Sequence, residues 1–156
     1  DNGTDDIQYL ISTNPGETLK PLGQIVSGGE LSRIMLALKA ILADRDEIET
    51  LIFDEIDTGI SGRTAWKVAE QLSTLAGAHQ VICITHLPQI AAMADVHFII
   101  EKSSTDDMTI TDIHKVAEEE SLAELARLLG SDALTEAALS NAKEMKEQAN
   151  GFKEAR

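Results

Sequence analysis

A glycine-rich turn at the start of a helix is the sequence feature that most constrains the fold of this chain. The turn reads Ser27-Gly28-Gly29-Glu30, and apolar residues follow it at helical intervals as far as Leu42. Ser27 and Glu30 have the spacing of a capping box, so we expect the helix to begin at the glycines. A second glycine exceeds what capping requires, which favours close approach of a phosphate to the backbone at the positive helix end. Simple capping by Ser27 is the alternative.

Two carboxylates, Asp54 and Glu55, follow a short apolar strand predicted over Leu51–Phe53. Because the chain turns at the end of a strand, both side chains can reach one crevice. An aspartate there can bind Mg²⁺ beside a phosphate, and a glutamate can orient and deprotonate a water molecule. The glycine turn and the carboxylate pair therefore meet the complementary needs of nucleotide hydrolysis. A solvated acidic loop is the alternative, since an Asp-Glu pair alone is a weak motif.

The β-branched run Val81–Thr85 predicts a central parallel strand, and His86 follows it directly. A histidine at the end of such a strand can contact a γ-phosphate and respond to its loss, although a lone histidine is more often structural. The other three histidines have no comparable setting, and no metal-ligand spacing links them: His79, His97 and His114.

Three segments together resemble a known family. SGGE followed by LSR looks like the signature motif of ATP-binding-cassette ATPases, in the form carried by SMC-like repair and chromosome ATPases. With LIFDEIDTGISG and THLPQIA, the chain is similar to the RecN family, the SMC-like ATPases of bacterial recombination and double-strand-break repair. The resemblance implies that Asp54 binds Mg²⁺ with ATP, that Glu55 is the catalytic base, and that His86 is catalytic at the γ-phosphate.

The same resemblance implies a role in trans for the glycine turn. In the family this motif binds the ATP of a second head when ATP drives dimerisation. The residues that would do so here are Ser27, Gly28, Gly29 and Glu30. The loop after Glu55 usually ends in an aspartate that makes dimer contacts. Ser61 stands at that position here, so Asp57 and Ser61 are the expected substitutes at the nucleotide.

One motif of this class is missing. None of the ten glycines is followed by lysine, so the chain has no G-x-x-x-x-G-K-[ST] phosphate loop. In RecN-like proteins that loop lies in an N-terminal lobe, and a coiled coil separates the two lobes. We therefore expect a C-terminal lobe that is inactive alone and holds neither ATP nor Mg²⁺ tightly. Its expected partners are the N-terminal lobe and a second copy of the head.

The order of predicted elements indicates an α/β fold with a mainly parallel sheet flanked by helices, the C-terminal half of an SMC-type P-loop ATPase head. We expect one lobe over 1–156, with an α/β part over 1–116 and a C-terminal helical pair over 117–156.

Local patterns add further expectations. An antiparallel or edge strand is predicted over Asp5–Thr13, followed by an irregular segment around Pro21 and Gly23. The helical pair is predicted over Leu122–Leu129 and from Leu134 to about Gln148, with a frayed tail over 150–156.

The composition sets limits on partners and compartment. The formal charge is −14, from 13 basic and 27 acidic residues, which disfavours this chain as the main surface for DNA or an anionic membrane. The single cysteine, Cys83, excludes a disulfide framework and favours a reducing cytoplasm. The family resemblance implies a bacterial protein associated with the nucleoid. No apolar run reaches transmembrane length.

Two alternatives remain beside this interpretation. A phosphoacceptor receiver domain shares the acidic α/β character, with Asp54, Thr85 and Lys102 as its key residues. It requires acids after the first strand, whereas Asp5 and Asp6 precede it. A head of a cohesin- or condensin-like chromosome-structuring ATPase would use the same chemistry, and the sequence separates it only through the DTGISG and THLPQIA segments.

The charge distribution generates a prediction about DNA. The basic residues are scattered singly, and glutamates interrupt the C-terminal group that comes nearest to a basic stripe. Since clustered Lys and Arg contacts to phosphates dominate DNA affinity, we expect this chain alone to bind no duplex DNA at physiological ionic strength. A fluorescence anisotropy titration measures this. Salt-sensitive binding by the chain alone with a sub-micromolar Kd would contradict the prediction.

Overall fold

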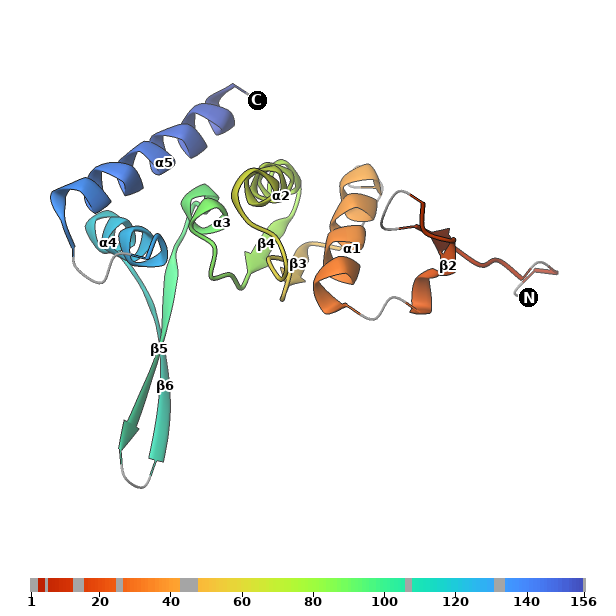
Figure 1. Ribbon diagram of the computed structural model, residues 1–156, viewed down its shortest axis with the longest axis horizontal. Helices are drawn as coiled ribbons and strands as arrows, with labels where there is room; N and C mark the ends of the chain where they lie inside the picture. The colour runs from red at the N-terminus through yellow and green to blue at the C-terminus, as the bar shows by residue number, and fades with distance from the viewer. Residues whose placement is uncertain are drawn as a thin grey trace.

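The computed structural model describes residues 3–4, 6–12, 16–24, 27–42, 48–105, 108–130 and 134–155, and Figure 1 shows the arrangement of its elements. The helices lie in a row, one long hairpin projects away from them, and the two chain ends lie far apart. In chain order the elements are β1 (Leu10–Ile11), β2 (Lys20–Pro21), the 3-10 helix η1 (Leu22–Gln24), α1 (Gly28–Leu42), β3 (Thr50–Phe53), α2 (Gly62–Leu75), β4 (Gln80–Cys83), α3 (Pro88–Met93), β5 (Phe98–Thr105), β6 (Met108–Lys115), α4 (Glu118–Leu128) and α5 (Glu136–Glu154). The mixture confirms the α/β class.

Parallel pairing is limited to β3 and β4 in the described part of the chain. Leu51 lies opposite Val81, and Phe53 lies opposite Cys83. The pairs β1–β2 and β5–β6 are antiparallel. The expected parallel sheet is thus represented by one pair of strands, joined through the crossover helix α2 as parallel strands require.

One apolar cluster joins the sheet to all five α-helices. Leu51 and Phe53 are buried on one face of β3, as the period of two along a strand requires. Helix α2 presents a buried stripe at helical spacing: Ala65, Val68, Ala69, Leu72 and Leu75. The C-terminal helices enter the same cluster through Leu125 of α4 and Met145 of α5. The helical pair therefore packs on the α/β part. The division of the chain into parts over 1–116 and 117–156 remains a prediction.

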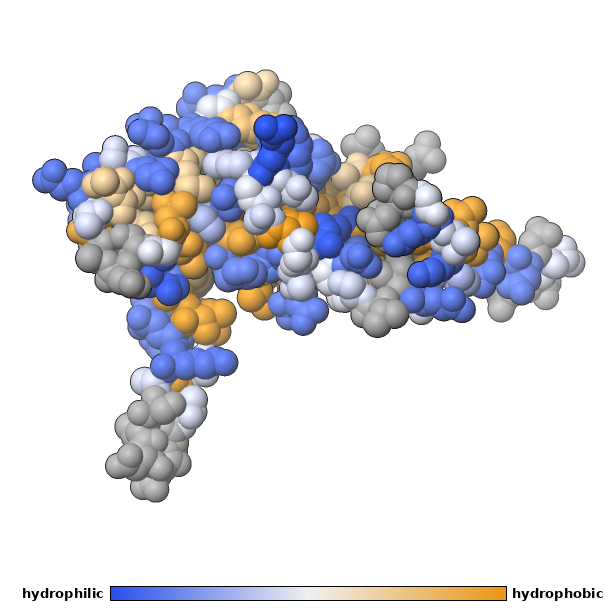
Figure 2. Space-filling view, in the orientation of Figure 1, coloured by the Kyte–Doolittle hydropathy of each residue, from blue (hydrophilic) through white to orange (hydrophobic). Residues whose placement is uncertain are grey.

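The opposite face of the parallel pair is open. Ile52, Ile82 and Ile84 are 67%, 45% and 47% exposed on that side. Parallel sheets are ordinarily covered on both faces. The exposure of these three side chains shows that no described residue covers this face. Figure 2 shows further apolar side chains at the surface near the base of the β5–β6 hairpin, where Phe98 and Ile113 are exposed. Within the described residues, no helix has the length and apolar character to cross a membrane.

The N-terminal segment differs from the prediction. A strand over Asp5–Thr13 is wrong, because β1 contains two residues and 6–9 carry no regular structure; residues 5 and 13 lie outside the described residues. The segment around Pro21 and Gly23 is not irregular, since Pro21 ends β2 and Gly23 lies in η1. Pro21 has no N–H to donate between the strands, and the Leu22 N–H makes the next hydrogen bond, to Tyr9 O at 2.8 Å.

The C-terminal helices are longer than predicted. Helix α4 begins at Glu118 rather than Leu122, because three glutamates in its first turn are favourable at a positive helix end. Helix α5 continues to Glu154, so a frayed tail is wrong for the residues that the structure describes. Phe152 packs against the apolar cluster, and Lys153 Nζ lies 2.6 Å from Asp95 Oδ1. These contacts join segments far apart in the chain.

Candidate nucleotide site

The carboxyl ends of β3 and β4 lie side by side, and three of the predicted site residues leave the sheet there. Phe53 is opposite Cys83, and the Ile84 N–H donates to Phe53 O at 3.0 Å. Asp54 and Glu55 therefore leave β3 beside the point where His86 leaves β4. The structure brings these residues to one edge of the sheet.

Glu55 has a left-handed backbone conformation, with φ of 57°, and no other described non-glycine residue has a positive φ. Such a conformation costs a glutamate about 1–3 kcal/mol and persists where the surroundings enforce it. The Thr58 N–H donates to Glu55 O at 3.1 Å and closes the turn. The Glu55 side chain lies against the first turn of α1, because a Cβ added to Gly28 would collide with Glu55 Oε2.

Gly29 is buried under the same loop. A Cβ at this position would lie 2.8 Å from Glu55 O and 2.9 Å from Thr58 Cβ. The chain's own loop therefore occupies the space beside the second glycine. This packing alone requires a glycine at position 29. The presence of two glycines therefore no longer indicates that a phosphate binds there. Ser27 fits the capping alternative, since the Glu30 N–H lies 3.5 Å from Ser27 Oγ, a long hydrogen bond.

Arg33 was missed by the sequence reasoning. Its Nη1 donates to Ile56 O at 3.1 Å and to Thr58 O at 2.9 Å, which fastens the loop after β3 to α1. Ser32 Oγ adds a hydrogen bond to Asp54 O at 2.9 Å. Arg33 follows Gly29 by four residues and shares its helix face, so the missing side chain leaves the arginine room to reach the loop. That glycine–arginine spacing is the signal that could have revealed it.

Asp57 holds the loop from the other side. The residue is 4% exposed, and its Oδ2 accepts hydrogen bonds from Thr85 Oγ1 at 2.7 Å and from the His86 N–H at 2.8 Å. The same oxygen lies 2.8 Å from Nδ1 of His86, whose side chain is 72% exposed. A contact of Asp57 with a second subunit stays a prediction, and its burial leaves little surface for one. Ser61 is exposed at the start of α2 and makes no side-chain capping bond there.

Asp54 is exposed, and its Oδ1 accepts a hydrogen bond from the Glu55 N–H at 2.8 Å. Mg²⁺ is usually held by one or two carboxylates together with phosphates and waters. The described residues contain no group of three or more His, Cys, Asp or Glu side chains that could hold a metal ion. Asp54 therefore fits the role of a single protein ligand beside a nucleotide, and not that of a self-contained metal site.

The thiol of Cys83, at the end of β4, has a raised pKa. Burial, reinforced by the negative charges of Asp57 and Asp54, raises the pKa of its thiol to about 12. The thiol therefore stays protonated at neutral pH.

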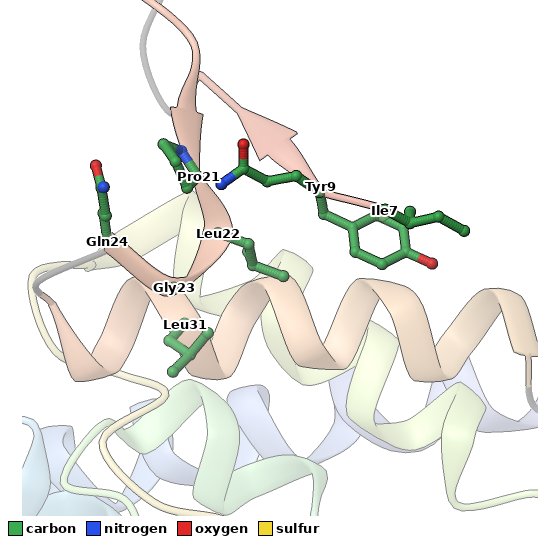
Figure 3. Close-up of a pocket in the computed structure, with 8 residues that line it drawn as sticks. Ile7, Tyr9, Pro21, Leu22, Gly23, Gln24 and Leu31 are labelled. Atoms are coloured by element: carbon green, nitrogen blue, oxygen red, sulfur yellow. The ribbon is translucent and has the colours of Figure 1, made fainter. Parts of the chain in front are cut away.

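A separate hollow of about 640 Å³ lies between the N-terminal strands and α1 (Figure 3). The described residues that line it are apolar apart from one phenol and two amides, and none of them is a carboxylate, a histidine or a cation: Ile7, Gln8, Tyr9, Pro21, Leu22, Gly23, Gln24 and Leu31. In the close-up, Leu22 points toward α1. This hollow does not fit the chemistry of a magnesium nucleotide.

Comparison with solved structures defines the class of fold. The chain superimposes on a structure from work on the ATP-driven dimerisation and DNA-stimulated activation of SMC ATPases, with a TM-score of 0.50 and 23% identity over 80% of this chain and 81% of that chain. The fold is that of an SMC-type ATPase head. No protein-family model matches the chain.

Sequence relatives narrow this class to one family. The chain is 44% identical over 153 residues to the DNA repair protein RecN of Halalkalibacterium halodurans, and 50% and 46% identical over 143 residues to those of Treponema pallidum and Vibrio cholerae. These matches cover 98%, 92% and 92% of this chain, but only 27%, 25% and 26% of the relatives. The resemblance to RecN is confirmed: the chain corresponds to a C-terminal portion, about a quarter, of such proteins.

Two helical glycines test the enclosure of Gly29. Gly151 in α5 has nothing within 4 Å of an added Cβ, so Gly151→Ala should stabilise the fold by about 0.5–1 kcal/mol through helix propensity. Gly29→Ala gains the same propensity but pushes the loop away from α1. We expect urea denaturation to give Gly29→Ala a lower free energy of unfolding than the wild type. That free energy should also be at least about 1 kcal/mol lower than that of Gly151→Ala. Equal stabilisation of both variants would mean that the loop does not enclose Gly29.

The half-buried thiol of Cys83 gives a second prediction. Because only the thiolate is alkylated, iodoacetamide at about pH 8 should modify Cys83 at least about 100-fold more slowly in the folded chain than in urea. Mass spectrometry of quenched samples measures both rates. Comparable rates would contradict the raised pKa and the placement of Cys83 beneath the two aspartates.

Proposed function

We propose that the complete protein is an SMC-like ATPase of bacterial DNA double-strand-break repair, and that this chain supplies the hydrolytic residues of its nucleotide site. Glu55 orients and deprotonates the attacking water. Asp54 is the protein's carboxylate ligand for Mg²⁺, and His86 contacts the γ-phosphate. Bound Mg²⁺ would neutralise charge that develops on the phosphate oxygens.

The observation that carries this proposal is the backbone of Glu55. Its φ of 57° holds a carboxylate just past the end of β3, at the same edge of the sheet from which His86 leaves β4. No hydrogen bond or ion pair within the described residues accounts for that carboxylate. Strain kept at an exposed acid without a structural partner supports a functional role.

The glycine turn acts in trans in this proposal. The first turn of α1, with Ser27, Gly28 and Glu30, would bind the ATP held by a second copy of the head. Glu55 Oε2 lies against Gly28 at the positive end of α1, where an anionic group is favoured, and this supports the role in trans. An incoming phosphate would have to displace Glu55 from Gly28, so docking of the second head would free the catalytic carboxylate.

The missing phosphate loop makes the N-terminal lobe an obligatory partner. That lobe would also cover the open face formed by Ile52, Ile82 and Ile84, whose exposure supports a further sheet layer or strand there. The chain alone would hold neither ATP nor Mg²⁺ tightly and would not hydrolyse ATP. DNA contacts at the bacterial nucleoid would come from the other lobe or from the assembled dimer.

Glu55→Gln in the complete protein tests the proposal. The amide cannot accept the proton of the water, so turnover should fall at least about 100-fold while ATP binding is retained. ATP-bound dimers should then accumulate, which light scattering after size exclusion detects.

Glu147→Gln is the matched control, since it makes the same charge change on the exposed side of α5. It should leave turnover within about twofold of the wild type. If Glu55→Gln also kept turnover within that range, Glu55 would not be the base.

A further inference from the structure

Three polar groups surround one oxygen at the centre of the site. Asp57 Oδ2 accepts hydrogen bonds from Thr85 Oγ1 at 2.7 Å and from the His86 N–H at 2.8 Å, and His86 Nδ1 faces the same oxygen at 2.8 Å as an ion-pair contact. Thr85 Oγ1 in turn accepts the Leu87 N–H at 3.0 Å. The two hydrogen-bond donors are a backbone N–H and a hydroxyl that is itself held. The position of the carboxylate is therefore set independently of the imidazole.

The chemistry of the pair then determines where the ring carries its hydrogen. An ionised carboxylate only accepts hydrogen bonds, so the His86 nitrogen that faces it must be N–H. Which nitrogen of a histidine is protonated is set by the hydrogen bond that the other nitrogen makes. Nδ1 of His86 faces Asp57, and the His86 side chain is 72% exposed. The ring edge that carries Nε2 is therefore the one accessible to solvent.

We propose that Asp57 is a positioning residue for His86: its buried carboxylate holds the neutral imidazole as the Nδ1–H tautomer and turns Nε2 outward. The value of this arrangement for catalysis rests on the proposed contact of His86 with the γ-phosphate. Phosphate oxygens accept hydrogen bonds, so Nε2 donates to them only when the ring carries both hydrogens. The neutral Nδ1–H tautomer carries no hydrogen at Nε2, so the orientation leaves Nε2 accessible to take up the proton that donation to the γ-phosphate requires.

A purely structural role is the competing explanation, because Asp57 also ties the loop to the end of β4. Thr85→Val separates the two. Valine keeps the shape of threonine but removes one donor to Oδ2 and the acceptor for the Leu87 N–H. It weakens the loop attachment and leaves the contact between Oδ2 and Nδ1 in place.

The experiment is two-bond ¹H–¹⁵N spectroscopy of the histidine rings in this chain, with His86 assigned through His86→Gln. At about pH 9, where imidazoles are neutral, the wild type should show a protonated Nδ1 and an unprotonated Nε2. Asp57→Ala should lose this pattern and move toward the Nε2–H tautomer, and Thr85→Val should keep it.

Three results would overturn the proposal. These are an Nε2–H tautomer in the wild type, an unchanged Nδ1–H tautomer in Asp57→Ala, and a tautomer shift in Thr85→Val as large as that in Asp57→Ala. If Asp57→Ala does not fold, the wild-type and Thr85→Val spectra still decide.

Turnover in the complete protein tests the catalytic part separately. Asp57→Ala should lower ATP turnover about 10- to 100-fold, the range for removing a carboxylate behind a functional histidine, and Thr85→Val should stay within about threefold. An unaffected turnover in His86→Gln would reject the proposed phosphate contact. The spectra would then still decide whether Asp57 positions the ring.

Discussion

The buried carboxylate of Asp57 is the interaction on which the geometry of the site depends. It joins the loop after β3 to the end of β4 through Thr85 and His86, at 2.7 and 2.8 Å. Burying a carboxylate costs free energy unless hydrogen-bond donors surround it. The positions of the donors at Thr85 and His86 therefore determine where the loop lies. Arg33 fastens the other side of the loop to α1 through two backbone carbonyls. Glu55 immediately precedes these attachments, and the Thr58 N–H closes the turn in which its backbone is left-handed.

This arrangement explains how a portion of a protein can hold the proposed hydrolytic residues in order without a complete site. The positions of Asp54, Glu55 and His86 depend on contacts within the chain, and not on a nucleotide. What the chain lacks is a cradle for phosphates and cover for the open face of β3 and β4. Both deficits fit a composite site, in which binding groups and hydrolytic groups come from different segments.

The sequence predicted the features that depend on local order. Helix α1, the β3–β4 pair with its crossover helix, and the meeting of Asp54, Glu55 and His86 at strand ends all follow from periodicity and from the geometry of parallel strands. Contacts between distant segments could not be predicted in this way. The burial of Asp57, the reach of Arg33 past Gly29 and the packing of Phe152 depend on such contacts. Gly29 shows this limit most clearly. The sequence indicated that a phosphate approaches its backbone, whereas in the structure the loop with Glu55 and Thr58 occupies that space.

Isothermal titration calorimetry with magnesium and ATP tests most directly the claim that this chain holds one part of a composite site. The isolated chain should give no saturable heat up to millimolar nucleotide, because it has the carboxylates but no phosphate loop. The complete protein, titrated in parallel, should bind ATP, and Glu55→Gln should retain that binding. Micromolar affinity of the isolated chain for ATP would contradict the account, since the nucleotide site would then be complete within these residues.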